Sequence, residues 1–377
     1  CKPGSMWPSF KGKSKYWEPS VAFVTLLTAV VVAFFPFFRE PARLLPSAGD
    51  GMKNYFTYLY HIKFDKELWR FDGMNYPFGE NVVFTDNQPI LSALVKIFYR
   101  LWPVGDATLI AIHNWTIFLG LILGGLGIFI CLRYRNVPFV FSLLISVGLM
   151  FLQPQIARFF SHFSLVYPFL PWIFYFWFRL INGEGTDWSS VWIGLLTIFA
   201  GLIHLYHFLA IAVFCLLAIT YFCFFSTRIS DWLTGLKMAV IQVFVPLAVL
   251  LAMSNRIYPV PDRPAETWGF FSYTANVLSY FFSFRLPLYR FIDSNITPVL
   301  TPTHPEAFNY IGIVAVVFLL GLLVAAIKGL LFSKKLILPR DKTDRFLIWV
   351  FITTVLVSFG LPFTITGLEW LLDYAGP

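Results

Sequence analysis

The sequence predicts an all-α polytopic membrane protein, and three features of its composition carry that prediction. Hydrophobic residues make up 58% of the 377 residues and charged residues only 13%, whereas a soluble globular domain carries about 25% charged residues. The mean hydropathy is +0.71. Aromatic side chains reach 20% of the chain, which suits positions that face lipid and the membrane–water interface.

Nine apolar segments approach the length of about 20 residues that a helix needs to cross a bilayer. The predicted spans lie near residues 20–38, 107–132, 138–152, 163–181, 189–203, 207–226, 237–253, 308–327 and 346–361. A single helix over 189–226 would far exceed the hydrocarbon core at roughly 1.5 Å per residue. The sequence therefore predicts a hairpin there that turns at "HLYH", residues 204–207.

The distribution of lysine and arginine predicts the orientation. The N-terminal tail and the loop at 328–345 are rich in basic residues, and nine spans place both on one side of the membrane. The positive-inside rule assigns that side to the cytoplasm. The net charge of +8 is explained by this topology, and no nucleic-acid partner is expected. Two long loops, 39–106 and 254–307, then lie on the outer face.

The first outer loop contains two aromatic-rich stretches with cations on one face, "NYFTYLYHIKF" (54–64) and "ILSALVKIFYRLW" (90–102). Both read as short amphipathic helices on the membrane surface. In the second outer loop, residues 268–284 are apolar enough to span. A tenth span there would move the basic 328–345 loop outside, so an interfacial or re-entrant helix is predicted instead.

The ends of the chain predict an incomplete natural sequence. Residues 1–19 form a cytoplasmic tail in which "CKPGSM" indicates residues left by cloning ahead of Met6. Residues 20–377 form one transmembrane domain that is expected to continue beyond Pro377. The four cysteines give no disulfide framework.

Four motifs in the chain carry a resemblance to a known family. They are "GDGMKNYF" (49–56), "GMNYPFGENVVFTDNQPIL" (73–91), "RFFSHFSLVYPFLPW" (158–172) and "HPEAFNYIGI" (304–313). Over roughly residues 20–325, the chain resembles the GT-C superfamily of membrane glycosyltransferases, and within it bacterial proteins related to the YfhO family. The resemblance implies a polyprenyl phosphate sugar as donor and transfer on the outer face. It also implies that an acid soon after the first span is catalytic.

Asp50 is the first candidate catalytic residue. It lies between two glycines shortly after the first predicted span, where desolvation at the bilayer edge can raise a carboxyl pKa and help it act as a base. The structural alternative is an N-cap of the helix that follows. Asp86, in "TDNQP", is the second candidate, with a local turn role as its alternative. Glu80 together with Asp86 offers oxygen ligands that suit Mg²⁺ or Mn²⁺, and metal dependence is left open.

Cations and aromatic residues supply candidates for binding the donor phosphate and sugar. Arg158 and His162 stand at i and i+4, so they share a face if their turn is helical, although an arginine at an interface is commonly an anchor. The second outer loop adds a further group: Arg256, Arg263, Glu266 and Trp268. His204 and His207, at the hairpin turn, are candidates for binding a metal or a sugar. The alternative is that they are simply polar residues at an interfacial turn.

Together these observations predict a glycosyltransferase of the bacterial inner membrane, with its site on the periplasmic side. It would move a sugar from a polyprenyl phosphate carrier onto a cell-envelope glycan or lipid. A transporter or flippase of lipid-linked sugars is the alternative from another class. Transporters favour polar or broken helices at mid-membrane, whereas the span centres here are nearly free of charge. A non-catalytic partner in envelope assembly is the third alternative.

Overall fold

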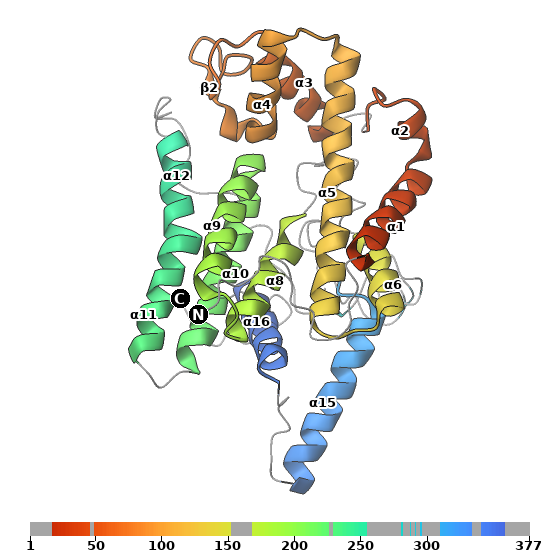
Figure 1. The fold of residues 1–377 in the computed structure, drawn as a ribbon, viewed down its shortest axis with the longest axis vertical. Helices are drawn as coiled ribbons and strands as arrows, with labels where there is room; N and C mark the ends of the chain where they lie inside the picture. The colour runs from red at the N-terminus through yellow and green to blue at the C-terminus, as the bar shows by residue number, and fades with distance from the viewer. Residues whose placement is uncertain are drawn as a thin grey trace. The chain divides into compact units, whose positions relative to one another are not determined.

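The computed structural model describes residues 17–45, 49–151, 168–225, 229–254, 280–281, 287, 291, 295, 310–333 and 341–358. The chain divides into two compact units, Cys1–Pro259 and Val260–Pro377. In the second unit the described helices are α15 (Ile313–Ser333) and α16 (Lys342–Ser358). The first unit contains the candidate site and is described below (Figure 1).

The first unit is mostly helical. Its elements, in chain order, are α1 (Glu18–Ala33), α2 (Phe35–Arg39), α3 (Asp50–Lys63), β1 (Arg70–Phe71), β2 (Glu80–Asn81), a 3₁₀ turn (Val82–Phe84), α4 (Pro89–Leu101), α5 (Asp106–Tyr134), α6 (Phe139–Met150), α8 (Phe169–Ile181), α9 (Thr186–Ile203), α10 (Leu205–Phe224), α11 (Ile229–Ala239), a π-helix (Val240–Phe244) and α12 (Val245–Ser254). The two short strands pair antiparallel.

Three of the described helices are long and apolar enough to cross a membrane. They are Asp106–Tyr134, Leu205–Phe224 and the continuous helix Ile229–Ser254. Shorter apolar helices occupy five of the other predicted spans: Glu18–Ala33, Phe139–Met150, Phe169–Ile181, Asp187–Ile203 and Ala315–Gly329. The structure thus confirms a helical chain with candidate membrane spans, and the full count of nine stays a prediction.

The long helix α5 is the centre of this unit. Helices α1, α6 and α8 pack along it, and their buried apolar residues form the core: Leu26 and Val30 of α1 meet Ile117, Phe118 and Leu121 of α5. Gly125 permits the close approach, because a Cβ there would lie 2.9 Å from Leu26.

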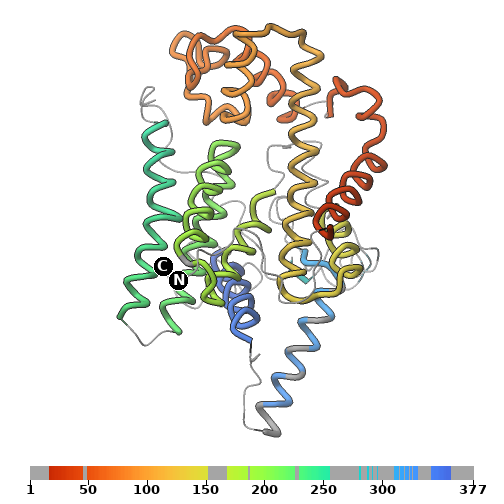
Figure 2. The backbone as a smooth tube through the Cα atoms, viewed as in Figure 1, coloured from red at the N-terminus to blue at the C-terminus, as the bar shows by residue number. Residues whose placement is uncertain are grey.

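Residues 50–101, within the predicted first outer loop, form a head at the end of the unit where α5 begins (Figures 1 and 2). It holds α3, the β1–β2 hairpin and α4, so both predicted amphipathic helices are present. Helix α4 exposes an apolar stripe: Leu94, Ile97, Phe98, Leu101 and Trp102. Its opposite face buries Lys96, whose ammonium donates to the carbonyl of Glu67. This one-sided exposure of apolar side chains fits the predicted amphipathic helix.

The predicted hairpin at 204–207 is confirmed. Helix α9 ends at Ile203 and α10 begins at Leu205. Between them His204 has an extended backbone, with φ −161° and ψ 135°, and its side chain accepts from the amide of Tyr206. The break places His204 at the end of α9.

Candidate functional site

The site is built on the turn that joins β2 to α4. Asp86 and Gln88 both adopt positive φ, 59° and 56°, a left-handed conformation that few residues other than glycine, asparagine and aspartate accept. Thr85, Asn87 and Gln88 are buried. Asn81, at the start of the turn, accepts from the amide of Val83 and donates to the carbonyl of Met253. The start of the turn is therefore tied to the end of α12.

Asp86 receives two donors from distant parts of the chain. Lys53 of α3 donates to Oδ2 at 3.0 Å, and His204 Nε2 lies 3.0 Å from Oδ1. The side chain of Asp86 keeps 24% of its surface exposed. We call Lys53, Asp86 and His204 the ionic clamp, since it ties α3, the turn and the α9–α10 break together.

The clamp sets the protonation of Asp86. Burial alone would raise its pKa, but the hydrogen bonds from His204 and Lys53 outweigh burial and lower the pKa from 3.8 to about 2. The carboxylate is ionised at neutral pH and is a weak base. This weakens the prediction that Asp86 is catalytic. The alternative, in which Asp86 makes hydrogen bonds within its own turn, also differs from the structure, where its partners are the distant Lys53 and His204.

Both ring nitrogens of His204 also make hydrogen bonds. Its Nδ1 accepts from the amide of Tyr206 at 3.2 Å, so the ring proton lies on Nε2 and is donated to Asp86. Both ring nitrogens are used, which leaves no lone pair for base catalysis. The ring of His207 lies 6.3 Å from that of His204 and 5.8 Å from Phe169.

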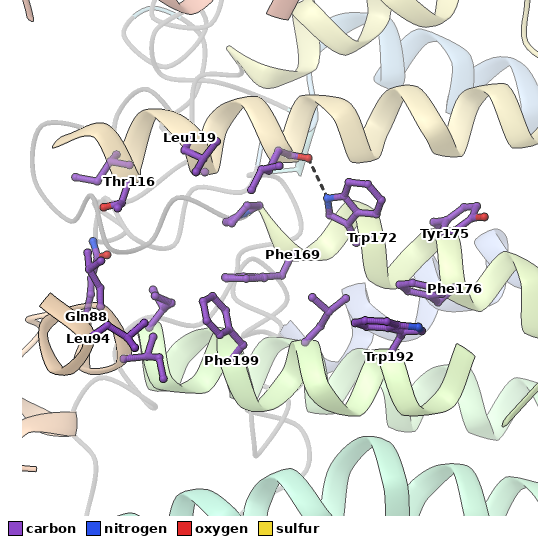
Figure 3. Close-up of a pocket in the computed structure, with 18 of the residues that line it drawn as sticks. Gln88, Leu94, Thr116, Leu119, Phe169, Trp172, Tyr175, Phe176, Trp192 and Phe199 are labelled. Atoms are coloured by element: carbon purple, nitrogen blue, oxygen red, sulfur yellow. Dashed lines mark hydrogen bonds between the residues drawn. The ribbon is translucent and has the colours of Figure 1, made fainter. Parts of the chain in front are cut away.

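An elongated apolar groove begins beside the clamp. Its volume is about 580 Å³, and it lies between α4, α5, α8 and α9 (Figure 3). Gln88 and Thr116 stand at one end, and Tyr175, Phe176 and Trp192 at the other. Trp172 of α8 donates to the carbonyl of Leu123 at 3.0 Å, which fixes its ring against the wall. The lining between these ends is aliphatic and aromatic.

The dimensions of the groove match one leaflet of a bilayer. On α9 the lining residues run from Trp192 to Ile203, about 16 Å at the helical rise, and half the hydrocarbon core is about 15 Å. At the end with Gln88 and Thr116, which we call the mouth, Ile203 is followed directly by His204, and Gln88 lies two residues after Asp86. The ionic clamp and the apolar groove are therefore adjacent.

Asp50 is the first residue of α3, and Gly49 holds the N-cap position. The structural alternative, in which Asp50 is the N-cap, is wrong, because Gly49 is the N-cap, with φ 69° and ψ −149°, a backbone region essentially restricted to glycine. Asp50 is exposed and lies one helical turn from Lys53. Asn114 of α5 holds the segments before and after Asp50. It donates to the carbonyls of Pro41 and Arg43 at 2.8 and 2.9 Å, and it accepts from Tyr55 Oη.

A family model described as a domain of unknown function (DUF6311) matches residues 21–373. The chain belongs to the DUF6311 family. No curated protein and no solved structure matches it. The DUF6311 match names no activity, so the resemblance to GT-C enzymes stays a prediction.

The other predicted site residues of this DUF6311 chain have different outcomes. Glu80 accepts from Asn75 at 3.0 Å, and within the described ranges no three histidine, cysteine or acidic side chains form a group that could hold a metal. The remaining predicted residues lie outside the described residues: Arg158, His162, Arg256, Arg263, Glu266 and Trp268.

Sequence reasoning missed Lys53. Asp50, Asp86 and His204 were predicted as separate candidates, and Lys53 was not among them. The available signal was its place at i+3 from Asp50 on a predicted helix, which puts the two side chains on one face.

Proposed function

We propose that this protein is a membrane glycosyltransferase that takes a sugar from a polyprenyl phosphate carrier and transfers it to a cell-envelope glycan or lipid. The site would face the periplasm from the bacterial inner membrane. One observation carries the proposal: the apolar groove of about 580 Å³ opens beside the ionic clamp. This is the arrangement that an amphiphile with one long chain and an anionic head requires.

The groove supports a lipid chain as ligand. Ligand sites are mainly apolar with a few placed polar groups, and here the polar groups gather at the mouth, where Gln88 and Thr116 stand (Figure 3). A depth of about one leaflet suits a chain that enters from the same leaflet as its headgroup.

The chemistry assigned to Asp50 is a single displacement. The acceptor hydroxyl oxygen forms a bond to the anomeric carbon of the sugar while the bond from that carbon to the phosphate oxygen breaks. The electron pair of the broken bond leaves with the polyprenyl phosphate, and the acceptor proton passes to the Asp50 carboxylate. Asp86 is poorly suited to this role, because its carboxylate accepts from Lys53 and His204 and its pKa is lowered to about 2.

Binding and turnover test the proposal separately. Purified protein in nanodiscs is titrated with undecaprenyl phosphate and followed by native mass spectrometry, and a panel of polyprenyl phosphate hexoses is then supplied with envelope extract as acceptor. The expected result is saturable lipid binding together with release of undecaprenyl phosphate and a glycosylated product. Binding followed by movement of intact donor across proteoliposomes, without product, would replace the transferase by a flippase. Binding with neither result would leave an assembly partner.

A further inference from the structure

We propose that Lys53 and His204 form the site for the anionic headgroup, and that Asp86 occupies this site as an internal competitor which the ligand displaces. This inference rests on the proposed function, since it concerns the mouth of the same groove. It assigns Asp86 a role opposite to that of a catalytic or ligand-binding acid: its carboxylate opposes binding.

The first support is convergence. Lys53 comes from α3 and His204 from the α9–α10 break, yet both donate to one carboxylate, at 3.0 Å each. A phosphate oxygen is an acceptor of the same kind as a carboxylate oxygen, and both make charge-assisted hydrogen bonds to such donors. The two donors are thus already spaced for a small oxyanion.

The second support is location. His204 directly follows Ile203 and Asp86 lies two residues before Gln88, and both Ile203 and Gln88 line the groove. A chain seated in the groove would bring its phosphate to the clamp. The other lysine–aspartate pair of the head, Lys63 with Asp106 at 2.8 Å, has no groove-lining residue within two positions of either member and makes a natural comparison.

The third support is the conformation of the turn. Asp86 and Gln88 both hold positive φ, and such residues cost of order 1–3 kcal/mol each unless their surroundings enforce them. Asn87 and Gln88 are buried, whereas Asp86 is the partly exposed member of the turn. Its side chain can therefore swing toward water when an anion takes Lys53 and His204, and the buried anchors stay in place.

The exchange breaks no covalent bond. Two hydrogen bonds to the Asp86 carboxylate are replaced by two to the headgroup, and the Asp86 carboxylate becomes hydrated. The carboxylate remains near the mouth as a like charge, which weakens binding of the anion. Neutralising Asp86 should therefore strengthen binding, and neutralising Lys53 should weaken it.

The test compares three probes on the full chain in nanodiscs: undecaprenyl phosphate, undecaprenol and inorganic phosphate. We expect Asp86→Asn to bind undecaprenyl phosphate about tenfold more tightly than the parent, and Lys53→Gln to bind it about tenfold more weakly. Undecaprenol should bind all variants alike. Inorganic phosphate should show the same order at far lower affinity, because it lacks the chain; phosphate binding as tight as that of the lipid would overturn a lipid headgroup as the ligand.

Asp106→Asn is the matched control, since it frees Lys63 from an aspartate in the same head. It should leave every affinity unchanged. Should Asp86→Asn fail to fold, the double variant Lys53→Gln/Asp86→Asn decides, because it must bind undecaprenyl phosphate more tightly than Lys53→Gln alone.

The possible failures are distinct. Parent protein that binds neither lipid overturns the proposed function, and this inference falls with it. Parent protein that binds both lipids, while Asp86→Asn leaves undecaprenyl phosphate affinity unchanged or reduced, overturns the competitor role alone.

Discussion

His204 donates its Nε2 proton to Oδ1 of Asp86 at 3.0 Å, across 118 positions of sequence. The bond joins the turn before α4 to the end of α9, a helix that contributes Trp192, Leu196, Phe199 and Ile203 to the groove lining. Because Lys53 holds the second carboxylate oxygen, any change at Asp86 acts on α3 and α9 together.

The ionic clamp should make the folding stability of the protein fall as the pH is lowered into the acid range. The pKa of Asp86 is about 2 in the folded protein and near its ordinary value of about 3.9 when unfolded. A carboxyl whose folded pKa is lowered contributes stability above its unfolded pKa and loses it as pH falls through the folded pKa. We expect a contribution of about 2 kcal/mol at neutral pH that disappears between about pH 4 and pH 2.

Thermal unfolding midpoints of the lipid-free parent and Asp86→Asn, measured in detergent from pH 7 to pH 2, check this. The two proteins should differ at pH 7 and converge at pH 2. Asp106→Asn should show a smaller difference, since the Asp106 side chain is 56% exposed and surface pairs are weak. A parent–variant difference that persists at pH 2 would contradict the assigned ion pairing.

The groove can be filled without disturbing the backbone. Gly120 lines it, and a Cβ there would meet only Pro168, at 3.8 Å. Gly120→Leu should project its side chain into the groove and lower the affinity for both undecaprenyl phosphate and undecaprenol by at least about tenfold. Helix stability should not fall, because leucine is a better helix former than glycine.

Gly148→Leu on α6 provides the comparison. A Cβ at Gly148 would meet nothing within 4 Å, and this glycine is not in the groove lining. Native mass spectrometry should show parent-like lipid binding. Equal loss in both variants would mean that the effect comes from the helices in general, and the groove would lose its assigned ligand.

Local patterns predicted several elements well. The hairpin at 204–207 was predicted from the length of the apolar segment 189–226, because a single helix over those residues is too long for the hydrocarbon core. The two amphipathic helices followed from aromatic residues and cations at helical spacing. One detail does not follow from that pattern: Lys96, one of these cations, is buried, and burial lowers its pKa to about 8.

The site itself could not be predicted from local patterns. Asp86 meets Lys53 across 33 positions and His204 across 118, and no residue spacing encodes such contacts. The groove draws on four helices whose apolar residues look individually like lipid-facing ones. Only packing distinguishes a groove wall such as Phe199 from a side chain that faces the bilayer.

Topology is a prediction that rests on charge. Single cysteines near 75–85 should react with a membrane-impermeant maleimide in intact cells, and cysteines in the 328–345 loop should react only after lysis. The expectation follows from the basic residues of the 328–345 loop. The opposite pattern would place Asp50 and the clamp on the cytoplasmic side, where periplasmic transfer is excluded.

Asp50 can be separated from a structural acid by a matched pair. Asp50 and Asp106 each begin a helix directly after a glycine at the N-cap position, where a negative charge interacts favourably with the helix dipole, by about 0.3–1 kcal/mol. Asn in place of either keeps the shape and removes the charge. Both variants should therefore lose a similar, small amount of stability.

Only Asp50→Asn should lose sugar transfer. A general base typically contributes about 10²–10⁴-fold in rate, so turnover with a polyprenyl phosphate hexose should fall by that factor while undecaprenyl phosphate affinity stays within about twofold. Asp106→Asn should turn over like the parent. Near-parental transfer by Asp50→Asn would make Asp50 a helix-end residue of the same kind as Asp106. The base would then have to come from another acid, because the Asp86 carboxylate is held by Lys53 and His204.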